Sequence, residues 1–268
     1  MIIPLEFFIN PTPNYPKHNT SLLIEEYARN YFAKYPINSE WEYVPVGWTG
    51  YHCSNGYGKN LEPLQNFLDS LPKKKYWTIV QYDDGILVNF PCKTFACAFK
   101  GDYPIPVLCE RHKAERLKTR YWACFSGNLR NNPIRQEMYR RLSGSAGIYI
   151  RDSFTTASYI KDLCQSVFAL CPRGYGLTSF RLYEAMALDC IPIYISDIFW
   201  LPFQNKIDWG KCSILIRENE IDRIPGIIQN MNEKEIKERT DYIKQVSDKY
   251  FTMEGTCKEI AEIVKGLE

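Results

Sequence analysis

The sequence has little of what a metal site, a membrane span or a secretion signal needs. Its 268 residues include three histidines, and its ten cysteines never form a Cys-x-x-Cys pair, so a structural zinc site is not expected. No run approaches the ~20 continuous apolar residues of a membrane-spanning helix. Pro4, Glu6 and Asn10 interrupt the apolar start, which therefore does not match a signal peptide.

Charge of one sign is not in excess either. Basic residues number 33 and acidic residues 31, for a net charge of +2, whereas a nucleic-acid-binding surface is strongly basic. The hydrophobic content of 45% and the charged content of 24% are typical of a globular protein. Cysteines within apolar runs, such as Cys171 and Cys190, are typical of buried thiols in a reducing compartment. We therefore expect a folded cytoplasmic protein without a nucleic-acid or membrane partner.

Strand-like and helix-like segments alternate along the chain, which predicts an α/β fold with parallel sheets. The charged segment 110–120 has few apolar residues and indicates a domain boundary. We therefore expect one domain at 1–115 and another at 116–268, and the last helix can pack back on the N-terminal domain. Expected strands cover 5–9, 41–46, 75–82, 104–109, 121–128, 147–152, 166–171, 190–196 and 212–216. Expected helices cover 21–35, 61–71, 133–142, 155–165, 179–188 and three stretches from about 220 to 267.

The most informative segment is CPRGYGLTSFRLYEAMALDCIPIYISD, residues 171–197. An apolar strand ends in a turn that contains Gly174 and Gly176, after which Thr178 or Ser179 is expected to cap a helix. A glycine-rich turn before a helix binds anions, because free N–H groups and the positive end of the helix dipole face it. Arg173 adds a fork-shaped cation that suits phosphate oxygens.

The helix after this turn is apolar on nearly every face, which indicates burial, yet it contains Arg181 and Glu184. Buried charges are rare unless they are paired or used. One interpretation is a buried Arg–Glu pair that only contributes to packing. The other places both residues at the open end of a cleft, where Arg181 holds a diphosphate and Glu184 accepts hydrogen bonds from a ribose.

The same segment is close to the dinucleotide fingerprint Gly-x-Gly-x-x-Gly, so an NAD(P)-dependent dehydrogenase is an alternative. Asp197 ends the next strand, where such a fold places its ribose-binding acid. However, Ser179 stands at the position of the third glycine, and the motif lies far from the start of the chain. Both features disfavour the dehydrogenase.

The run CPRGYGLTSFRLYEA…CIPI..SD resembles the most characteristic segment of the exostosin family, glycosyltransferase family 47. Other pieces follow in the family's order: IVQYDD at 79–84, DYPIPV at 102–107, and FSGN with Arg130 and Arg135. The resemblance covers roughly residues 76–210. The residues before it match no pattern, and acceptor recognition is expected there.

This resemblance implies a GT-B fold, in which two Rossmann-like domains with parallel sheets face a central cleft. It implies a UDP-sugar donor in the C-terminal half, an inverting reaction and a glycan or glycoprotein acceptor. The chain has no Asp-x-Asp, the motif usual in metal-dependent transferases of the other major fold, so no metal or other cofactor is expected. Without an anchor or stem, the chain resembles a minimal soluble catalytic core of the kind found in bacteria or large DNA viruses.

An inverting transfer needs a general base, and the acidic end of the strand at 75–82 offers Asp83 or Asp84. Asp-Asp-Gly is also ordinary turn chemistry, and Asp102, Glu110 and His52 are further candidates for the base. Tyr175 is expected to stack on the uracil or the sugar. The full set of expected donor-binding residues is Asn128, Arg130, Arg135, Arg173, Gly174, Tyr175, Gly176, Ser179, Arg181 and Glu184.

An aromatic and glycine-rich loop, GWTGYHCSNGYG, supplies the expected acceptor-binding residues Trp48, Tyr51 and His52. Aromatic rings can cover the apolar face of a sugar, although the same composition fits a plain surface loop. The absence of surplus carboxylate-binding groups favours a neutral donor sugar such as xylose or galactose. A non-catalytic nucleotide-sugar binder, and a subunit whose partner supplies catalysis, are alternatives; the presence of the phosphate turn and Glu184 disfavours the first.

Overall fold

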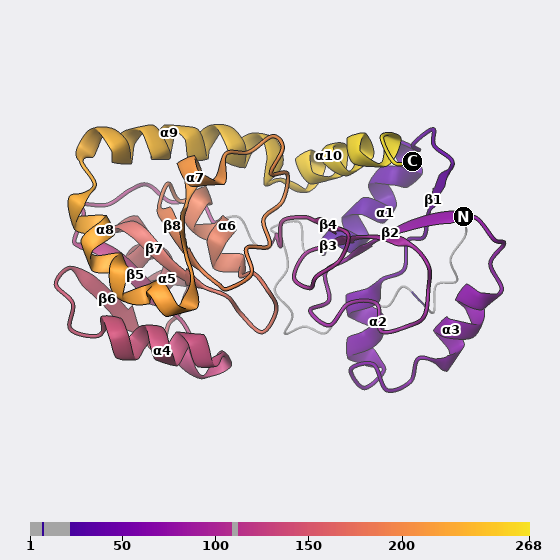
Figure 1. The fold of residues 1–268 in the computed structure, drawn as a ribbon, viewed down its shortest axis with the longest axis horizontal. Coiled ribbons are helices and arrows are strands. Elements are labelled where there is room, and N and C mark those ends of the chain that lie inside the picture. Colours follow the sequence, from indigo (N-terminus) through magenta and orange to yellow (C-terminus); the bar gives the residue numbers. More distant parts are fainter. Residues whose placement is uncertain (1–6, 8–21, 109–111) are drawn as a thin grey trace. The chain divides into compact units, whose positions relative to one another are not determined.

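A computed structural model describes Phe7, residues 22–108 and residues 112–268 (Figure 1). The chain divides into two compact units. The first unit comprises Met1–Glu110 together with Thr252–Glu268, and the second comprises Arg111–Phe251. Helix α10 (Met253–Lys265) therefore belongs with the N-terminal residues, where it contacts α1 (Ile24–Lys34).

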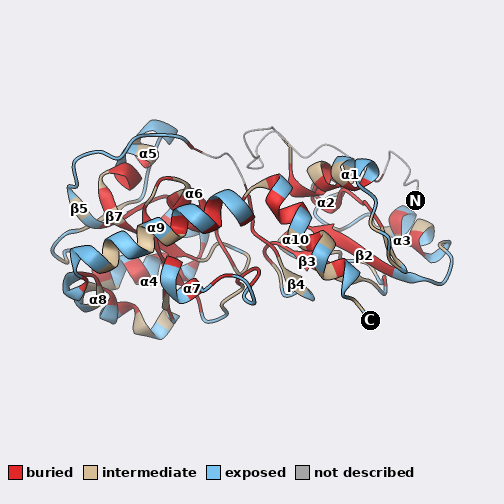
Figure 2. Ribbon diagram, turned by 90° about the horizontal axis from the view of Figure 1, so that it is seen from above, coloured by how far each residue is buried: buried red, intermediate tan, exposed pale blue. Residues whose placement is uncertain are grey.

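The first unit contains a four-stranded sheet in the order β1-β2-β3-β4, in which all neighbouring strands are parallel. Its central strand β2 is buried from its second residue onward, which Figure 2 shows by colour. Val80 lies in a cluster with Trp48 and Leu64, whereas the ring of Trp77 meets that of Phe32 in α1 at 5.1 Å. A parallel strand needs apolar residues on both faces because helices cover both. The elements are β1 (Trp41–Tyr43), α2 (Trp48–Ser54), α3 (Glu62–Asp69), β2 (Lys75–Val80), β3 (Lys93–Ala96) and β4 (Tyr103–Pro104).

The second unit contains a five-stranded parallel sheet in the order β6-β5-β7-β8-β9. The strand order reverses between β5 and β7, and ligands bind beyond the carboxyl ends of the strands at such a point. The strands are β5 (Tyr121–Ser126), β6 (Ile148–Arg151), β7 (Ser166–Pro172), β8 (Ile191–Ile195) and β9 (Ile214–Ile216). The helices are η2 (Leu129–Asn131), α4 (Pro133–Leu142), α5 (Thr156–Cys164), α6 (Phe180–Ala187), α7 (Trp209–Cys212), η3 (Glu218–Arg223), α8 (Ile224–Asn230) and α9 (Glu233–Tyr250).

One apolar cluster fixes helices α5 and α6 on the central strands of the second unit. Its buried members include Cys124 of β5, Cys171 of β7, Leu163 of α5 and Ala185 of α6. Small side chains on the strands let the two helices approach closely. This packing holds the start of α6 against the end of β7, which is the edge where the reversal lies.

The predicted alternation of strands and helices, with two parallel sheets, is confirmed. Two local expectations are wrong, and one strand was missed. Residues 48–54 form a helix and not a loop, and of the strand expected at 104–109 the described residues form only Tyr103–Pro104. Strand β3 at 93–96 had no counterpart among the expected strands. The strand expected at 5–9 lies outside the described residues except for Phe7, which is buried. Within the described ranges, no helix is both long and apolar enough to cross a membrane.

Candidate functional site

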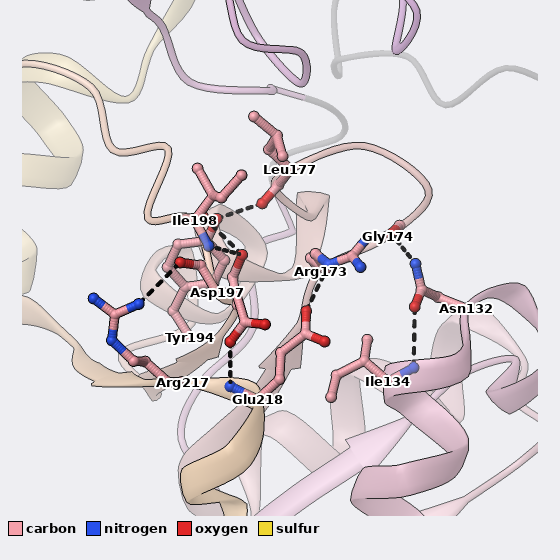
Figure 3. Close-up of polar contacts among 11 residues, drawn as sticks. Asn132, Ile134, Arg173, Gly174, Leu177, Tyr194, Asp197, Ile198, Arg217 and Glu218 are labelled. Atoms are coloured by element: carbon pink, nitrogen blue, oxygen red, sulfur yellow. Dashed lines mark hydrogen bonds and ion pairs between the residues drawn. The ribbon is translucent and has the colours of Figure 1, made fainter.

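Two loops meet beyond the carboxyl ends of β5 and β7, at the reversal of strand order (Figure 3). The side-chain amide of Asn132 donates to the carbonyl of Gly174 at 2.7 Å. The other end of the same side chain caps α4, because its oxygen accepts from the Ile134 amide at 3.0 Å. Asn132 was missed as a site residue, although asparagine before a proline at the first helical position is an N-cap signal.

The turn after β7 closes on itself. The amide of Gly174 donates to the carbonyl of Thr178 at 3.0 Å. Ser179 then occupies the N-cap position of α6, but its side chain makes no capping hydrogen bond. The expected glycine-rich turn before a helix is therefore present, whereas the expected capping bond from Ser179 is not.

Two buried arginines lie against the same aromatic ring at this edge. The guanidinium carbons of Arg181 and Arg135 lie 4.2 Å and 5.8 Å from the ring centroid of Phe125. Arg181 donates to the carbonyl of Ser126 at 2.6 Å, and Arg135 donates to the carbonyl of Asn128 at 3.1 Å. Both side chains are less than a tenth exposed. The loop after β5 therefore fixes both cations through its backbone.

Neither of these arginines has a direct ionic partner among the described residues. No guanidinium–carboxylate ion pair forms there at either side chain, and both Nε atoms are buried without a hydrogen-bond partner. Burial, and next the charge of Arg181, lower the pKa of Arg135 to about 10. Burying a charge without a counter-ion lowers the stability of the folded state. The pair is thus suited to receive an anion.

Gly127 permits this arrangement. A Cβ atom at this position would lie 2.5 Å from a terminal nitrogen of Arg181 and 3.2 Å from the ring of Phe125. Any side chain would therefore push Arg181 away from the Ser126 carbonyl. The glycine of the FSGN segment is required by the close approach of the guanidinium group to the backbone.

Two residues from other segments, Tyr159 and His112, approach the carboxylate of Glu184. The hydroxyl of Tyr159 donates to one carboxylate oxygen at 2.6 Å, and Nε2 of His112 lies 3.7 Å from the other. Burial, followed by the charge of Glu184, raises the pKa of Tyr159 well above its usual value. A carboxylate has about four acceptor positions, and Tyr159 and His112 approach different oxygens of this one. His112 lies in the charged segment that indicated a boundary and was not recognised from the sequence.

Arg173 is engaged differently from the other arginines (Figure 3). Its Nε lies 2.7 Å from an oxygen of Glu218, and the two side chains are 30% and 22% exposed. Asp197 accepts the amide of Glu218 at 3.0 Å and so joins the ends of β8 and β9. Asp197 is therefore a structural residue here, whereas Arg173 already has a carboxylate partner.

The remaining donor-side residues lie on the exposed rim. Tyr175 is 66% exposed, as a ring must be to stack on a ligand. Asn128 and Arg130 are exposed, and the Asn128 side chain accepts the Arg130 amide at 2.8 Å. The structure thus gathers Asn128, Arg135, Gly174 and Arg181 around the two loops.

The candidate bases lie in the first unit, just after β2. Asp83 is partly buried, Asp84 is exposed, and Gly85 completes the turn with a φ of 83°. Burial, and next the charge of Asp84, raise the pKa of Asp83 to about 6. A carboxyl group that titrates near neutral pH suits a general base. Residues 83–85 therefore form a turn, as their composition indicated, and this turn also contains a carboxyl group with a raised pKa.

The three expected acceptor-binding residues lie inside the first unit. Trp48, Tyr51 and His52 are 0%, 4% and 0% exposed, and the Trp48 indole donates to the Thr78 hydroxyl at 2.8 Å. Burial lowers the pKa of His52 to about 4. Such burial is typical of core residues, and nothing in their exposure supports acceptor contact. Among the described residues, no three His, Cys, Asp or Glu side chains gather into a group able to hold a metal ion.

The sequence profile of the exostosin GT47 domain matches residues 98–231, half of the chain. The chain belongs to the exostosin GT47 family. This confirms the resemblance, and the matched range contains both loops of the candidate donor site. It begins after Asp83 and Asp84, so the candidate bases lie outside the matched range.

Known relatives resemble this GT47 chain over part of their length. An exostosin-1 homolog of Caenorhabditis elegans is 34% identical over 99 residues, which are 37% of this chain and 26% of the relative. The probable glucuronoxylan glucuronosyltransferase IRX7 of Arabidopsis thaliana is 28% identical over 171 residues, covering 58% of this chain and 37% of the relative. The chain thus spans well under half the length of these relatives.

Solved structures resemble the chain more distantly. The crystal structure of TarM has a TM-score of 0.47 and 9% identity, covering 88% of this chain and 57% of TarM. A DNA-modifying β-glucosyltransferase has a TM-score of 0.40 and 10% identity, covering 76% and 77% of the two chains. The GT47 family membership rests on the sequence profile.

Proposed function

We propose that this GT47 chain is an inverting glycosyltransferase that moves a sugar from a UDP-sugar to a hydroxyl of a glycan or glycoprotein. The observation that carries the proposal is the pair of buried arginines on Phe125, which forms no direct ion pair with a described carboxylate and leaves both Nε atoms without a hydrogen-bond partner. A diphosphate supplies two adjacent anionic groups that match two guanidinium forks. The pair also lies at the strand-order reversal, where an α/β sheet binds ligands.

In the proposed reaction, Asp83 or Asp84 takes the proton of the acceptor hydroxyl. The acceptor oxygen forms a bond to C1 of the donor sugar while the bond from C1 to the diphosphate oxygen breaks on the opposite face. UDP leaves with the bonding electrons, and Arg135 and Arg181 stabilise the growing negative charge. Glu184 is proposed to accept the ribose hydroxyls, and Tyr175 to stack on the uracil.

Two cations in place of a metal ion are proposed to be sufficient for leaving-group stabilisation, so chelators should leave turnover unchanged. The sugar is proposed to be xylose or galactose. Glucuronic acid is a third candidate, because the curated plant relatives are described as probable glucuronosyltransferases. The exposed Arg130 near the donor loops is a cation that a uronic acid carboxylate can use.

Purified protein tested by thermal shift and donor hydrolysis against UDP-xylose, UDP-galactose, UDP-glucuronic acid, UDP and NAD decides among these possibilities. A ligand that binds only the folded state raises the melting temperature according to its affinity. We expect UDP and one UDP-sugar to stabilise the protein, and that sugar to be hydrolysed slowly. Stabilisation by NAD alone would overturn the proposal, and binding without hydrolysis or transfer would indicate a non-catalytic subunit.

We further propose that the protein acts in the cytoplasm. The nine described cysteines are all free, and most of them are buried, which suits a reducing compartment. Fractionation of native cells with an antibody tests this location. Recovery in the membrane fraction alone would contradict it.

A further inference from the structure

A fully buried carboxylate joins three elements of the first unit: α1, the start of α2 and the residue that follows β2. Glu25 lies in the first turn of α1 and is 1% exposed. It receives the amide of Thr49 at 3.0 Å on one oxygen, and the hydroxyl of Thr49 at 3.0 Å on the other. The amide of Gln81 donates to that second oxygen at 2.7 Å. None of these contacts belongs to a helix or sheet ladder.

The two donor residues lie in different elements of the first unit, so their bonds to Glu25 connect α2 and the end of β2 to α1. Thr49 lies in the first turn of α2, and Gln81 is the first residue after β2. Two residues later the chain reaches Asp83, the partly buried candidate base. Gln81 is itself 0% exposed, and its side-chain oxygen accepts the amide of Ile24 at 3.2 Å. The start of α1 and the exit from β2 are thus bonded in both directions.

The carboxylate is also poised to lose its charge near neutral pH. Burial raises the pKa of Glu25 to about 7 against the opposing effect of the Gln81 and Thr49 donors. Glu26 in the same turn adds a repulsion that acts in the same direction as burial. Three further titratable groups, the buried Cys97 and the partly buried Tyr43 and Cys53, lie near it. Burial raises the pKa of each, and the charge of Glu25 raises it further.

We propose that Glu25 is a positioning residue, whose carboxylate holds the exit from β2 against α2 and so fixes Asp83 for proton transfer. The inference rests on the proposed function, because it takes the base from the Asp83–Asp84 turn. Hydrogen bonds to a charged acceptor are stronger than those to a neutral one. The exit from β2 is therefore held most firmly when Glu25 is ionised.

The test compares Glu25→Gln with Glu26→Gln. Glu26 is a matched control because it is the next residue in the same turn, is buried, and accepts the Leu23 amide at 2.8 Å within the same helix start, not a donor of α2 or β2. Hydrogen exchange at the Gln81 and Thr49 amides is measured beside the kcat and donor KM of hydrolysis and transfer. A variant whose circular dichroism spectrum matches the wild type is taken as folded.

We expect E25Q to lower the protection of both amides about tenfold or more, since bonds to charged groups contribute about 1.5–3 kcal/mol. It should lower kcat about tenfold and leave the donor KM unchanged. Wild-type protection, corrected for intrinsic exchange, should fall as the pH drops below about 7, and E25Q should lack this dependence. If E25Q does not fold, Thr49→Val removes only the hydroxyl bond and should still lower Gln81 protection.

Equal protection in E25Q and E26Q would overturn the proposal, as would lost protection with unchanged kcat. The same holds for T49V if it must replace E25Q. A wild-type protein without turnover would instead refute the proposed function, and the exchange result would still show whether Glu25 holds the exit from β2. The two failures are therefore distinguishable.

Discussion

The two parallel sheets of this protein end in buried charges of opposite sign. Beyond β5 and β7 the second unit holds Arg135 and Arg181, each bonded to a backbone carbonyl. Beyond β2 the first unit holds Glu25 and Asp83, whose pKa values are raised to about 7 and about 6. The same edge of the same kind of sheet thus carries permanent cations in one unit and titratable acids in the other.

This difference follows from the chemistry of the side chains. Guanidinium groups stay charged at all physiological pH values, so the second unit must find an anion or bear the cost of an unbalanced charge. Carboxyl groups can escape that cost by taking up a proton. In the proposed function, the second unit accordingly holds the anionic donor and the first unit takes up the proton of the acceptor.

The largest effect is expected from removing the proposed proton acceptor of the first unit. Asp83→Asn should lower the kcat of sugar transfer about 100- to 10,000-fold, the usual contribution of a general base, with the Kd for UDP unchanged. Asp84→Asn is the matched control and should cost less than tenfold, since Asp84 is exposed. A larger loss in D84N would assign the base to Asp84, and no loss in either would place it elsewhere.

The variant Arg181→Met tests the role of the two buried arginines in the second unit. UDP should bind about 100-fold more weakly, because losing one partner of a buried charge pair costs about 2–5 kcal/mol. Without ligand, the free energy of unfolding should change little, since a buried unbalanced charge is removed together with its hydrogen bond. Titration calorimetry with UDP measures the first effect and denaturant unfolding the second. Arg140→Met, an exposed position paired with Glu137, should bind UDP normally.

The raised pKa of Asp83 predicts that the free energy of unfolding depends on pH. The folded pKa of Asp83 is raised to about 6, so the unfolded state loses this proton first as the pH rises from about 4 to about 6. Stability from the protonated form is therefore lost across that range, and wild type should fall relative to D83N by on the order of 2 kcal/mol. His52, with a pKa lowered to about 4, gives the opposite slope but cancels between the two proteins. A constant difference from pH 4 to 7 in urea unfolding would contradict the raised pKa.

The smallest expected effect concerns Arg173, whose ion pair with Glu218 sets it apart from the other donor-side arginines. Glu218→Gln should free Arg173 and strengthen UDP binding by about two- to fivefold, in keeping with the small energy of a partly exposed pair. Glu220→Gln, whose partner is Arg223, serves as the control. Unchanged affinity in E218Q would show that Arg173 does not reach the diphosphate.

The glycine-rich segment shows how much of the site could be predicted. Its residues indicated a turn before a buried helix, and the structure has both. The sequence left open whether Arg181 pairs with Glu184. Folding brings Phe125 and the Ser126 carbonyl to Arg181, and Tyr159 and His112 to Glu184. These partners come from other segments, so no local pattern contains them.

The GWTGYHCSNGYG segment shows the opposite case. Its glycines and aromatic residues favoured a loop, yet residues 48–54 form a helix. The burial of Trp48 and the bonds from Thr49 to Glu25 override the low helix propensity of the segment. Both partners lie elsewhere in the chain, so propensity alone could not show the helix.

Periodicity and contiguous motifs are enough to predict the α/β class, the GT47 family and the glycine-rich turn. The fold, in contrast, sets which charged side chains form ion pairs. It paired Arg173 with Glu218, left Arg135 and Arg181 on one ring, and buried Glu25 against Gln81, two residues before the candidate base Asp83. Charge balance depends on distances between residues far apart in the chain, and the fold sets those distances.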